Sequence, residues 1–316
     1  MKHYILTVLL LLAAAFASAQ EVRINVFPSG EYLFAQRDTC QLFMSVYDPA
    51  PESETAVQGK QKPTILFMFG GGFIMGDRNA KDYLPWFRLF NNNGYRVITI
   101  DYRLGLKGAG SLSVTDISVF YNAIQIGVED LYSATAFIID NAEALGVDPA
   151  NIVVAGSSAG AIISLQADWH LCNRNGHSGM LPADFRYAGV MSFSGAILSR
   201  EGKIRYAQTP APTLFMHGTA DKIVPYNKIA LFKNRFVGSS ALVKDFEKNG
   251  YNYNIYRFEG NQHEIASAFV RTFPEQLRFL ETNVIKGEKR IVDTSVSDPS
   301  IKIWKINSIS EIYKKN

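Results

Sequence analysis

A glycine-rich motif at residues 156–160, Gly-Ser-Ser-Ala-Gly, presents a serine that could act as a nucleophile. An apolar, strand-like run at 151–155 precedes the motif, and a helix-like run follows it. A sharp turn from strand to helix requires Gly156 and Gly160, because a Cβ at either position would clash. Such a turn makes Ser158 project from the carboxyl end of the strand, where the helix N-terminus favours negative charge. The alternative is a purely structural glycine–serine turn.

A serine nucleophile needs a base, and the chain has five histidines. In this kind of site the chain order is serine, then acid, then histidine. His263 is the only histidine that follows Asp221, and it lies in a loop after a strand-like run. We therefore predict that His263 is the base. His170 and His177 precede the expected acid and are interpreted as structural residues, whereas His217 ends a strand-like run.

Asp221 is the predicted acid, because it directly follows a strand-like run. A carboxylate there can accept the Nδ1 proton of His263 and stabilise the imidazolium ion. Alternatively, Asp221 could cap a helix that begins near Tyr226. Glu259 and Glu264 flank the histidine and are rival acids, but neither stands at a strand end that would direct it at the ring.

Three consecutive glycines at 70–72 follow another strand-like run. Glycines leave backbone N–H groups uncovered, and together with the N–H of Ala159 these could form an oxyanion hole. A dinucleotide-binding loop would need glycine at position 75. Met75 stands there and Gly76 comes one residue late, so we reject the dinucleotide interpretation.

Strand-like and helix-like segments alternate along the chain, which predicts one α/β sheet domain. Several of the apolar runs are unbroken, as expected for strands that are buried on both faces of a parallel sheet. The predicted strands are 42–46, 64–69, 95–100, 151–155, 187–193, 213–217 and 253–258. Predicted helices include 82–93, 130–145 and 264–282, the last with an irregularity at Pro274.

The composition excludes several classes of protein. The chain has 316 residues, of which 47% are hydrophobic and 19% charged, with a formal charge of +3. These values are unlike those of disordered chains, and 24 Gly with 12 Pro are far too few for a collagen-like chain. A nearly balanced charge gives no footprint for nucleic acid or an anionic membrane. With two cysteines and few histidines, the sequence suggests neither a metal nor an organic cofactor.

The first nineteen residues have the pattern of a secretory signal peptide. Lys2 precedes an almost wholly apolar run at 5–16, and Ala-Ser-Ala at 17–19 predicts cleavage before Gln20. The alternative, a membrane anchor, would need roughly 20 apolar residues. We therefore expect export to the periplasm or outside the cell, which would permit a disulfide between the two cysteines, Cys40 and Cys172.

Over roughly residues 40–285 the chain resembles the α/β-hydrolase superfamily, and within it carboxylesterases of the BD-FAE-like and hormone-sensitive-lipase-like types. The resemblance implies Ser158 as nucleophile, His263 as base and Asp221 as acid. It also implies an oxyanion hole formed by the N–H groups of Gly71, Gly72 and Ala159. The motifs that carry it are Phe69–Phe73 with Gly76-Asp77, Asp101–Arg103, Glu129-Asp130, Gly156–Gly160, His217–Thr219 with Asp221, and His263.

Two residues depart from the family pattern. Such esterases usually carry a histidine before the glycines, where this chain has Phe69. The hormone-sensitive-lipase type has an aspartate where this chain has Ser157, so the match is better to the BD-FAE-like type. Asp101 and Asp130 are expected to be scaffold residues. Segments 104–113 and 168–185 are candidates to line the substrate pocket.

The expected fold is thus an α/β-hydrolase fold, with a mostly parallel central sheet, helices on both faces and no large cap domain. We divide the chain into a signal peptide (1–19), a catalytic domain (20–286) and a C-terminal extension of unknown role (287–316). That extension contains a strand-like run at 301–306. We expect it to pack on the body of the protein.

The expected function is hydrolysis of small or carbohydrate-linked esters, of acetyl or feruloyl type, by two-step acyl transfer. No nucleic-acid partner and no membrane span are expected. Two alternatives stay open. One is a serine peptidase of the prolyl-oligopeptidase type, although the chain leaves no room for its usual propeller domain. The other is a non-catalytic binding module with a hydrolase fold.

Overall fold

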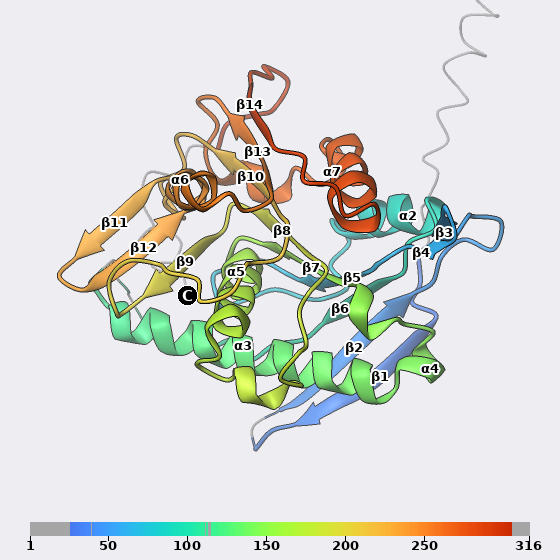
Figure 1. The fold of residues 1–316 in the computed structure, drawn as a ribbon. Helices are drawn as coiled ribbons and strands as arrows, with labels where there is room; N and C mark the ends of the chain where they lie inside the picture. Colours follow the sequence, from blue (N-terminus) through green and yellow to red (C-terminus); the bar gives the residue numbers. More distant parts are fainter. Residues whose placement is uncertain (1–25, 39, 111, 113–114, 305–316) are drawn as a thin grey trace, which may run out of the picture.

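A nine-stranded sheet forms the centre of the molecule (Figure 1). The computed structural model describes residues 26–38, 40–110, 112 and 115–304. The strand order is β1-β2-β6-β5-β7-β8-β10-β13-β14. The strands are β1 (Gly30–Gln36), β2 (Gln41–Tyr47), β5 (Thr64–Met68), β6 (Val97–Ile100), β7 (Ile152–Ser157), β8 (Gly189–Phe193), β10 (Thr213–Gly218), β13 (Tyr253–Phe258) and β14 (Val292–Val296).

Strand direction and burial agree with the prediction of a mostly parallel sheet. β1 pairs with β2, and β2 with β6, in antiparallel register, whereas the strands from β6 to β14 are mutually parallel. Every residue of β5, β6, β7, β8 and β10 is buried. Parallel strands covered on both faces need apolar side chains in both directions, which explains their unbroken apolar runs.

Helices cover both faces of the sheet (Figure 1). On one face α2 and α7 lie together, and Trp86 Nε1 donates a 2.7 Å hydrogen bond to Gln276 Oε1. On the other face α3 packs on α5, where Tyr132 Oη donates to the carbonyl of Ala167. The helices are α2 (Leu84–Asn92), α3 (Ile117–Asp140), α4 (Ala142–Leu145), α5 (Ala159–Asn173), α6 (Ser239–Asn249), α7 (Phe273–Phe279), the 3₁₀ turns η1 (Pro149–Asn151), η2 (Ser178–Met180) and η3 (His263–Ser267), and the π-helical turn η4 (Leu280–Ile285).

Two helices differ from their predicted limits. α3 begins at Ile117, thirteen residues before the predicted start at 130. Its first half contains Gly127, a poor helix former, where α5 packs closely: a Cβ there would lie 2.5 Å from Ile163 Cδ1, so the Ile163 side chain would have to shift. The predicted helix at 264–282 is divided into η3, α7 and η4. Pro274 lies in the first turn of α7, the position where a missing N–H costs least.

A small antiparallel sheet lies beyond the carboxyl ends of β8 and β10. It consists of β11 (Lys228–Leu231), β12 (Asn234–Gly238) and β9 (Ala196–Ser199), in that order. The prediction of a helix beginning near Tyr226 is therefore wrong, because the β11–β12 hairpin occupies that part of the chain. The described residues contain no large cap domain. A separate two-stranded ribbon is formed by β3 (Ala56–Val57) and β4 (Lys60–Gln61).

The C-terminal extension supplies the last strand of the central sheet. β14 pairs in parallel with β13, and Arg257 Nε of β13 binds Asp293 Oδ1 at 2.6 Å. The predicted strand at 301–306 is wrong over 301–304, which form no strand, and 305–306 lie outside the described residues. Residues 292–296 form the strand instead, because their backbone groups pair with those that β13 would otherwise leave unpaired at the sheet edge.

Three further expectations concern the ends of the chain and the cysteines. The predicted signal peptide at 1–19 lies outside the described residues. Among the residues that are described, no helix is long and apolar enough to cross a bilayer. Cys40 and Cys172 are both free thiols and do not form the disulfide that export would permit.

Candidate active site

Ser158 occupies a strained turn between β7 and α5, with φ 50° and ψ −115°. A Cβ added to Gly156 would lie 2.2 Å from the carbonyl oxygen of Gly160, and one added to Gly160 would lie 2.1 Å from that of Met68. Only glycine fits at these two positions, as the sequence motif predicts. The neighbouring Ser157 points away, donating its hydroxyl to the carbonyl of Ala266. The turn therefore presents one serine, and its strain is typical of a functional site.

The structure brings Ser158, His263 and Asp221 together from the ends of three strands. His263 Nε2 lies 2.7 Å from Ser158 Oγ, and His263 Nδ1 lies 2.7 Å from Asp221 Oδ2. Because a carboxylate can only accept a hydrogen bond, Nδ1 carries the proton and Nε2 is free to accept one from the serine hydroxyl. His263 is 6% exposed and Asp221 9%, so water competes little for these contacts.

Hydrogen bonds keep the buried Asp221 ionised. Burial opposes the charged form, but contacts with His217 and His263 outweigh it and hold the pKa of Asp221 well below its usual value. Its second oxygen, Oδ1, accepts from the backbone N–H groups of Ile223 at 2.8 Å and Val224 at 3.0 Å. These bonds close a turn rather than cap a helix, and they fix the orientation of the carboxylate.

His217 contacts the same oxygen of the acid as His263, a role that the sequence reasoning missed. Its Nε2 lies 3.2 Å from Asp221 Oδ2 and 3.2 Å from the carbonyl oxygen of Val224. Both neighbours are acceptors, so Nε2 carries the proton, and Nδ1 accepts from the hydroxyl of Ser239 at 2.8 Å. The only sequence signal was the four-residue spacing from His217 to Asp221 around one strand end.

The three predicted oxyanion-hole residues line the same cavity as Ser158 and His263. Gly71 has φ +127°, and a Cβ there would lie 1.9 Å from the carbonyl oxygen of Met75. Gly72 lines the cavity beside it, and Ala159 is the first residue of α5. Within the described residues, the N–H groups of Gly71 and Ala159 donate to no acceptor. Two donors thus stand beside the serine, one of them at a helix N-terminus.

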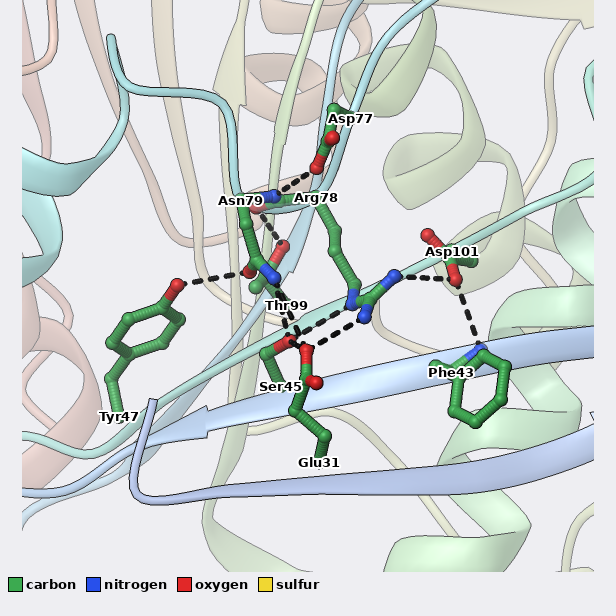
Figure 2. A network of polar contacts seen from close by, with 9 residues as sticks. All are labelled: Glu31, Phe43, Ser45, Tyr47, Asp77, Arg78, Asn79, Thr99 and Asp101. Atoms are coloured by element: carbon green, nitrogen blue, oxygen red, sulfur yellow. Dashed lines mark hydrogen bonds and ion pairs between the residues drawn. The ribbon is translucent and has the colours of Figure 1, made fainter. Parts of the chain in front are cut away.

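A polar network fixes residues 77–79, which follow the glycines, against the sheet (Figure 2). The guanidinium of Arg78 contacts Asp101 at 2.7 Å, Glu31 at 2.8 Å and Ser45 at 2.9 Å. Thr99 donates its hydroxyl to the carbonyl of Arg78 at 3.0 Å. One arginine thereby joins the segment to β1, β2 and β6. Asp101 is a scaffold residue, as the family resemblance implies.

Asp130 and Phe69 also have structural partners. Asp130 is fully buried in α3, where Arg37 and Arg103 bind its carboxylate. Phe69 replaces the histidine usual in the family, and its ring stacks on that of Tyr102 with centroids 4.4 Å apart. The hydroxyl of Tyr102 donates to the carbonyl of Phe69 at 3.0 Å. Stacking and this bond together position the start of the glycine segment.

The cavity around Ser158 has a volume of about 530 Å³ and mostly apolar walls. Segment 168–185 contributes no residue to it, and neither do the described residues of 104–113, so the expectation is wrong for these residues. Residues 111 and 113 lie outside the described part of the chain. α3 begins earlier than predicted and supplies Phe120 and Ile124 in their place. A long apolar helix thus takes the position that the sequence reasoning gave to loops.

Trp304, from the C-terminal extension, also lines this cavity. Its ring centroid lies 6.3 Å from that of His263, at an interplanar angle of 64°. Glu264 connects the two segments, because Oε2 accepts from the N–H of Trp304 and Oε1 from that of Gln262. Glu264, which the sequence offered as an alternative acid, therefore fixes the loop that carries His263. The other rival acid, Glu259, is exposed and accepts from a serine of β14.

The remaining chemistry-bearing groups lie elsewhere. His170 is buried and bonded to Gln166 and Asn175, and burial lowers its pKa to about 4. In the part of the chain that the structure describes, no three histidine, cysteine or acidic side chains are grouped so that they could hold a metal ion.

Comparisons with known proteins agree on one family. A family model described as "Carboxylesterase family" matches residues 17–173, and one described as "Phospholipase/Carboxylesterase" matches 114–280, more than half of the chain. Esterase E4 of Myzus persicae is 33% identical over 135 residues, which are 43% of this chain and 22% of that protein. Bile salt-activated lipase of Bos taurus is 30% identical over 131 residues, 40% of this chain and 21% of that protein. The matched region thus spans about a fifth of the length of these relatives.

Solved structures show the same fold. The apo form of Thermogutta terrifontis esterase 2 superposes with a TM-score of 0.58 at 21% identity, covering 82% of this chain and 96% of that one. The propionate-bound form of the same esterase gives a TM-score of 0.57 at 21% identity, covering 81% of this chain and 95% of that one. These superpositions and the nine-stranded sheet show the fold. The family models show that the chain belongs to the carboxylesterases of the α/β-hydrolase superfamily.

Proposed function

We propose that this protein is a serine carboxylesterase with Ser158 as nucleophile, His263 as base and Asp221 as acid. The observation that carries the proposal is the pair of 2.7 Å contacts joining these three side chains beside a cavity. Gly71, Gly72 and Ala159 form the oxyanion hole.

The reaction proceeds in two acyl-transfer steps. His263 takes the proton of the Ser158 hydroxyl as Oγ attacks the ester carbonyl carbon, and the backbone N–H groups bind the resulting oxyanion. Each such donor is worth about 3 kcal/mol in the transition state. The imidazolium then gives its proton to the departing alcohol oxygen as the C–O bond breaks. Water, activated by the same histidine, attacks the acyl-enzyme and releases the acid and Ser158.

Small or carbohydrate-linked esters, of acetyl or feruloyl type, are the proposed substrates. Support comes from the 530 Å³ cavity with apolar walls, a size suited to a small organic ligand. Thermogutta terrifontis esterase 2 has been solved with propionate and with butyrate bound. We also propose that the protein is exported, to the periplasm or beyond, on the basis of the signal-like sequence at 1–19.

The test compares Ser158→Ala with Ser157→Ala in purified protein. The two hydroxyls are adjacent in sequence, but only that of Ser158 contacts His263. Ser158→Ala should lose fluorophosphonate labelling and lower the kcat/KM for p-nitrophenyl acetate and butyrate by at least about 10³-fold. Ser157→Ala should still label.

The outcomes separate the alternatives. Unchanged turnover and labelling in Ser158→Ala would refute the assignment. Labelling of the wild type without ester turnover would favour a peptidase. A folded wild type that neither labels nor turns over an ester would favour a non-catalytic module.

A further inference from the structure

A second cavity, of about 640 Å³, lies next to the one that contains Ser158. Three apolar residues, Phe120, Ile223 and Phe236, line both cavities. Neither Ser158 nor His263 lines the second cavity. The two cavities therefore meet at a shared apolar wall. Of the three triad residues, only Asp221 lines the larger cavity, so that cavity borders the acid and not the serine.

The β11–β12 hairpin forms much of the wall of the second cavity. Ile229 and Leu231 of β11 line it, although they are 45% and 38% exposed. Ile229 lies directly opposite Phe236 of β12, one of the shared residues. A contiguous exposed apolar patch is a feature of ligand-binding grooves.

Close backbone packing and strand pairing fix the position of the hairpin that forms this wall. A Cβ on Gly238, at the end of β12, would lie 1.6 Å from the carbonyl oxygen of Pro225, so the two sides of the hairpin base are in close contact. Phe236 also pairs with Leu198 of β9, which lines the cavity as well. A preformed apolar site binds without a large ordering cost.

We propose that the second cavity is a substrate compartment that takes an extended apolar arm of the ester, aliphatic or aromatic. This proposal rests on the esterase function proposed above. Burial of such an arm releases water from the exposed side chains of Ile229 and Leu231 and from the arm itself. Of the two ester types proposed above, the compartment favours the longer, feruloyl type, whose arm is too long for the catalytic cavity alone, and acetyl esters are turned over less efficiently.

The test measures kcat/KM for p-nitrophenyl acetate, butyrate and octanoate with wild type and Ile229→Ser. Phe232→Ser is the matched control, because Phe232 is 89% exposed at the hairpin turn and lines neither cavity. The wild type should prefer octanoate. Ile229→Ser should lose about tenfold on octanoate and less than twofold on acetate. Phe232→Ser should match the wild type on all three esters.

A second arm of the experiment uses octyl acetate, in which the long chain belongs to the alcohol. A selective loss in Ile229→Ser on p-nitrophenyl octanoate or on octyl acetate supports the compartment and says which half of the ester enters it. An equal loss in Phe232→Ser would assign the effect to the whole hairpin and overturn the proposal.

The proposed function and the compartment fail in different ways. Turnover of acetate with no preference for longer chains, or with no selective loss in Ile229→Ser, overturns the compartment alone. If the wild type turns over no ester and is not labelled by fluorophosphonate, the proposed function fails and the compartment fails with it.

Discussion

Replacing His217 with phenylalanine should slow ester hydrolysis although the residue never touches the serine. The ring of His217 is fully buried, with Nε2 3.2 Å from Asp221 Oδ2, so phenylalanine fills the space but removes the donor. A hydrogen bond to a charged group contributes about 1.5–3 kcal/mol. Because this N–H is shared with the carbonyl of Val224, we take the lower value, about 1.5 kcal/mol. That predicts about a tenfold loss of kcat/KM.

The assay combines steady-state kinetics on p-nitrophenyl butyrate with a double-mutant cycle. Asp221→Asn alone should cost about 10⁴-fold. In that background, His217→Phe should cost much less than tenfold, because the acceptor that His217 served is gone. His217→Gln, which keeps a donor at a similar reach, should recover most of the rate.

Two results would refute this reasoning about His217. One is wild-type kcat/KM in a His217→Phe variant that stays folded by circular dichroism. The other is strict additivity of the two substitutions in the cycle, which would mean that His217 acts independently of the acid. A loss of rate in His217→Gln equal to that in His217→Phe would point to packing instead of hydrogen bonding.

Other parts of the structure lead to three further predictions. Trp304→Ala should widen the catalytic cavity and raise KM for p-nitrophenyl butyrate several-fold with little change in kcat; an unchanged KM would show that Trp304 does not meet the substrate. Burial raises the pKa of Asp168 to about 7 from 3.8, so the folded state holds a proton that the unfolded state releases. The free energy of unfolding should therefore fall by up to about 1.4 kcal/mol per pH unit as pH rises from about 4 to about 7. Asp168→Asn should flatten that dependence in urea unfolding at pH 5 and 8, and an unaltered slope would contradict it. Gly160→Ala should fail to accumulate as folded protein, because its Cβ would meet the carbonyl oxygen of Met68, and soluble active enzyme would disprove the clash.

The sequence alone predicted which three residues meet at the candidate active site. Gly156, Ser158 and Gly160 form a local motif whose turn permits one backbone path, and Asp221 and His263 follow buried strands in the required order. Unbroken apolar runs identified the strands, because a parallel sheet covered on both faces imposes that pattern. These are signals that short stretches of chain contain by themselves.

The tertiary structure decided which distant residues surround that chemistry. Trp304 reaches the cavity because β14 extends the sheet and turns the chain back toward His263. His217 contacts the Oδ2 atom of Asp221, and the β11–β12 hairpin lines a second cavity where the sequence suggested a helix. Such contacts join segments by packing rather than by spacing, and no local pattern encodes them. Sequence therefore determined the residues on which the proposed reaction rests, and only the fold determined the cavities around them.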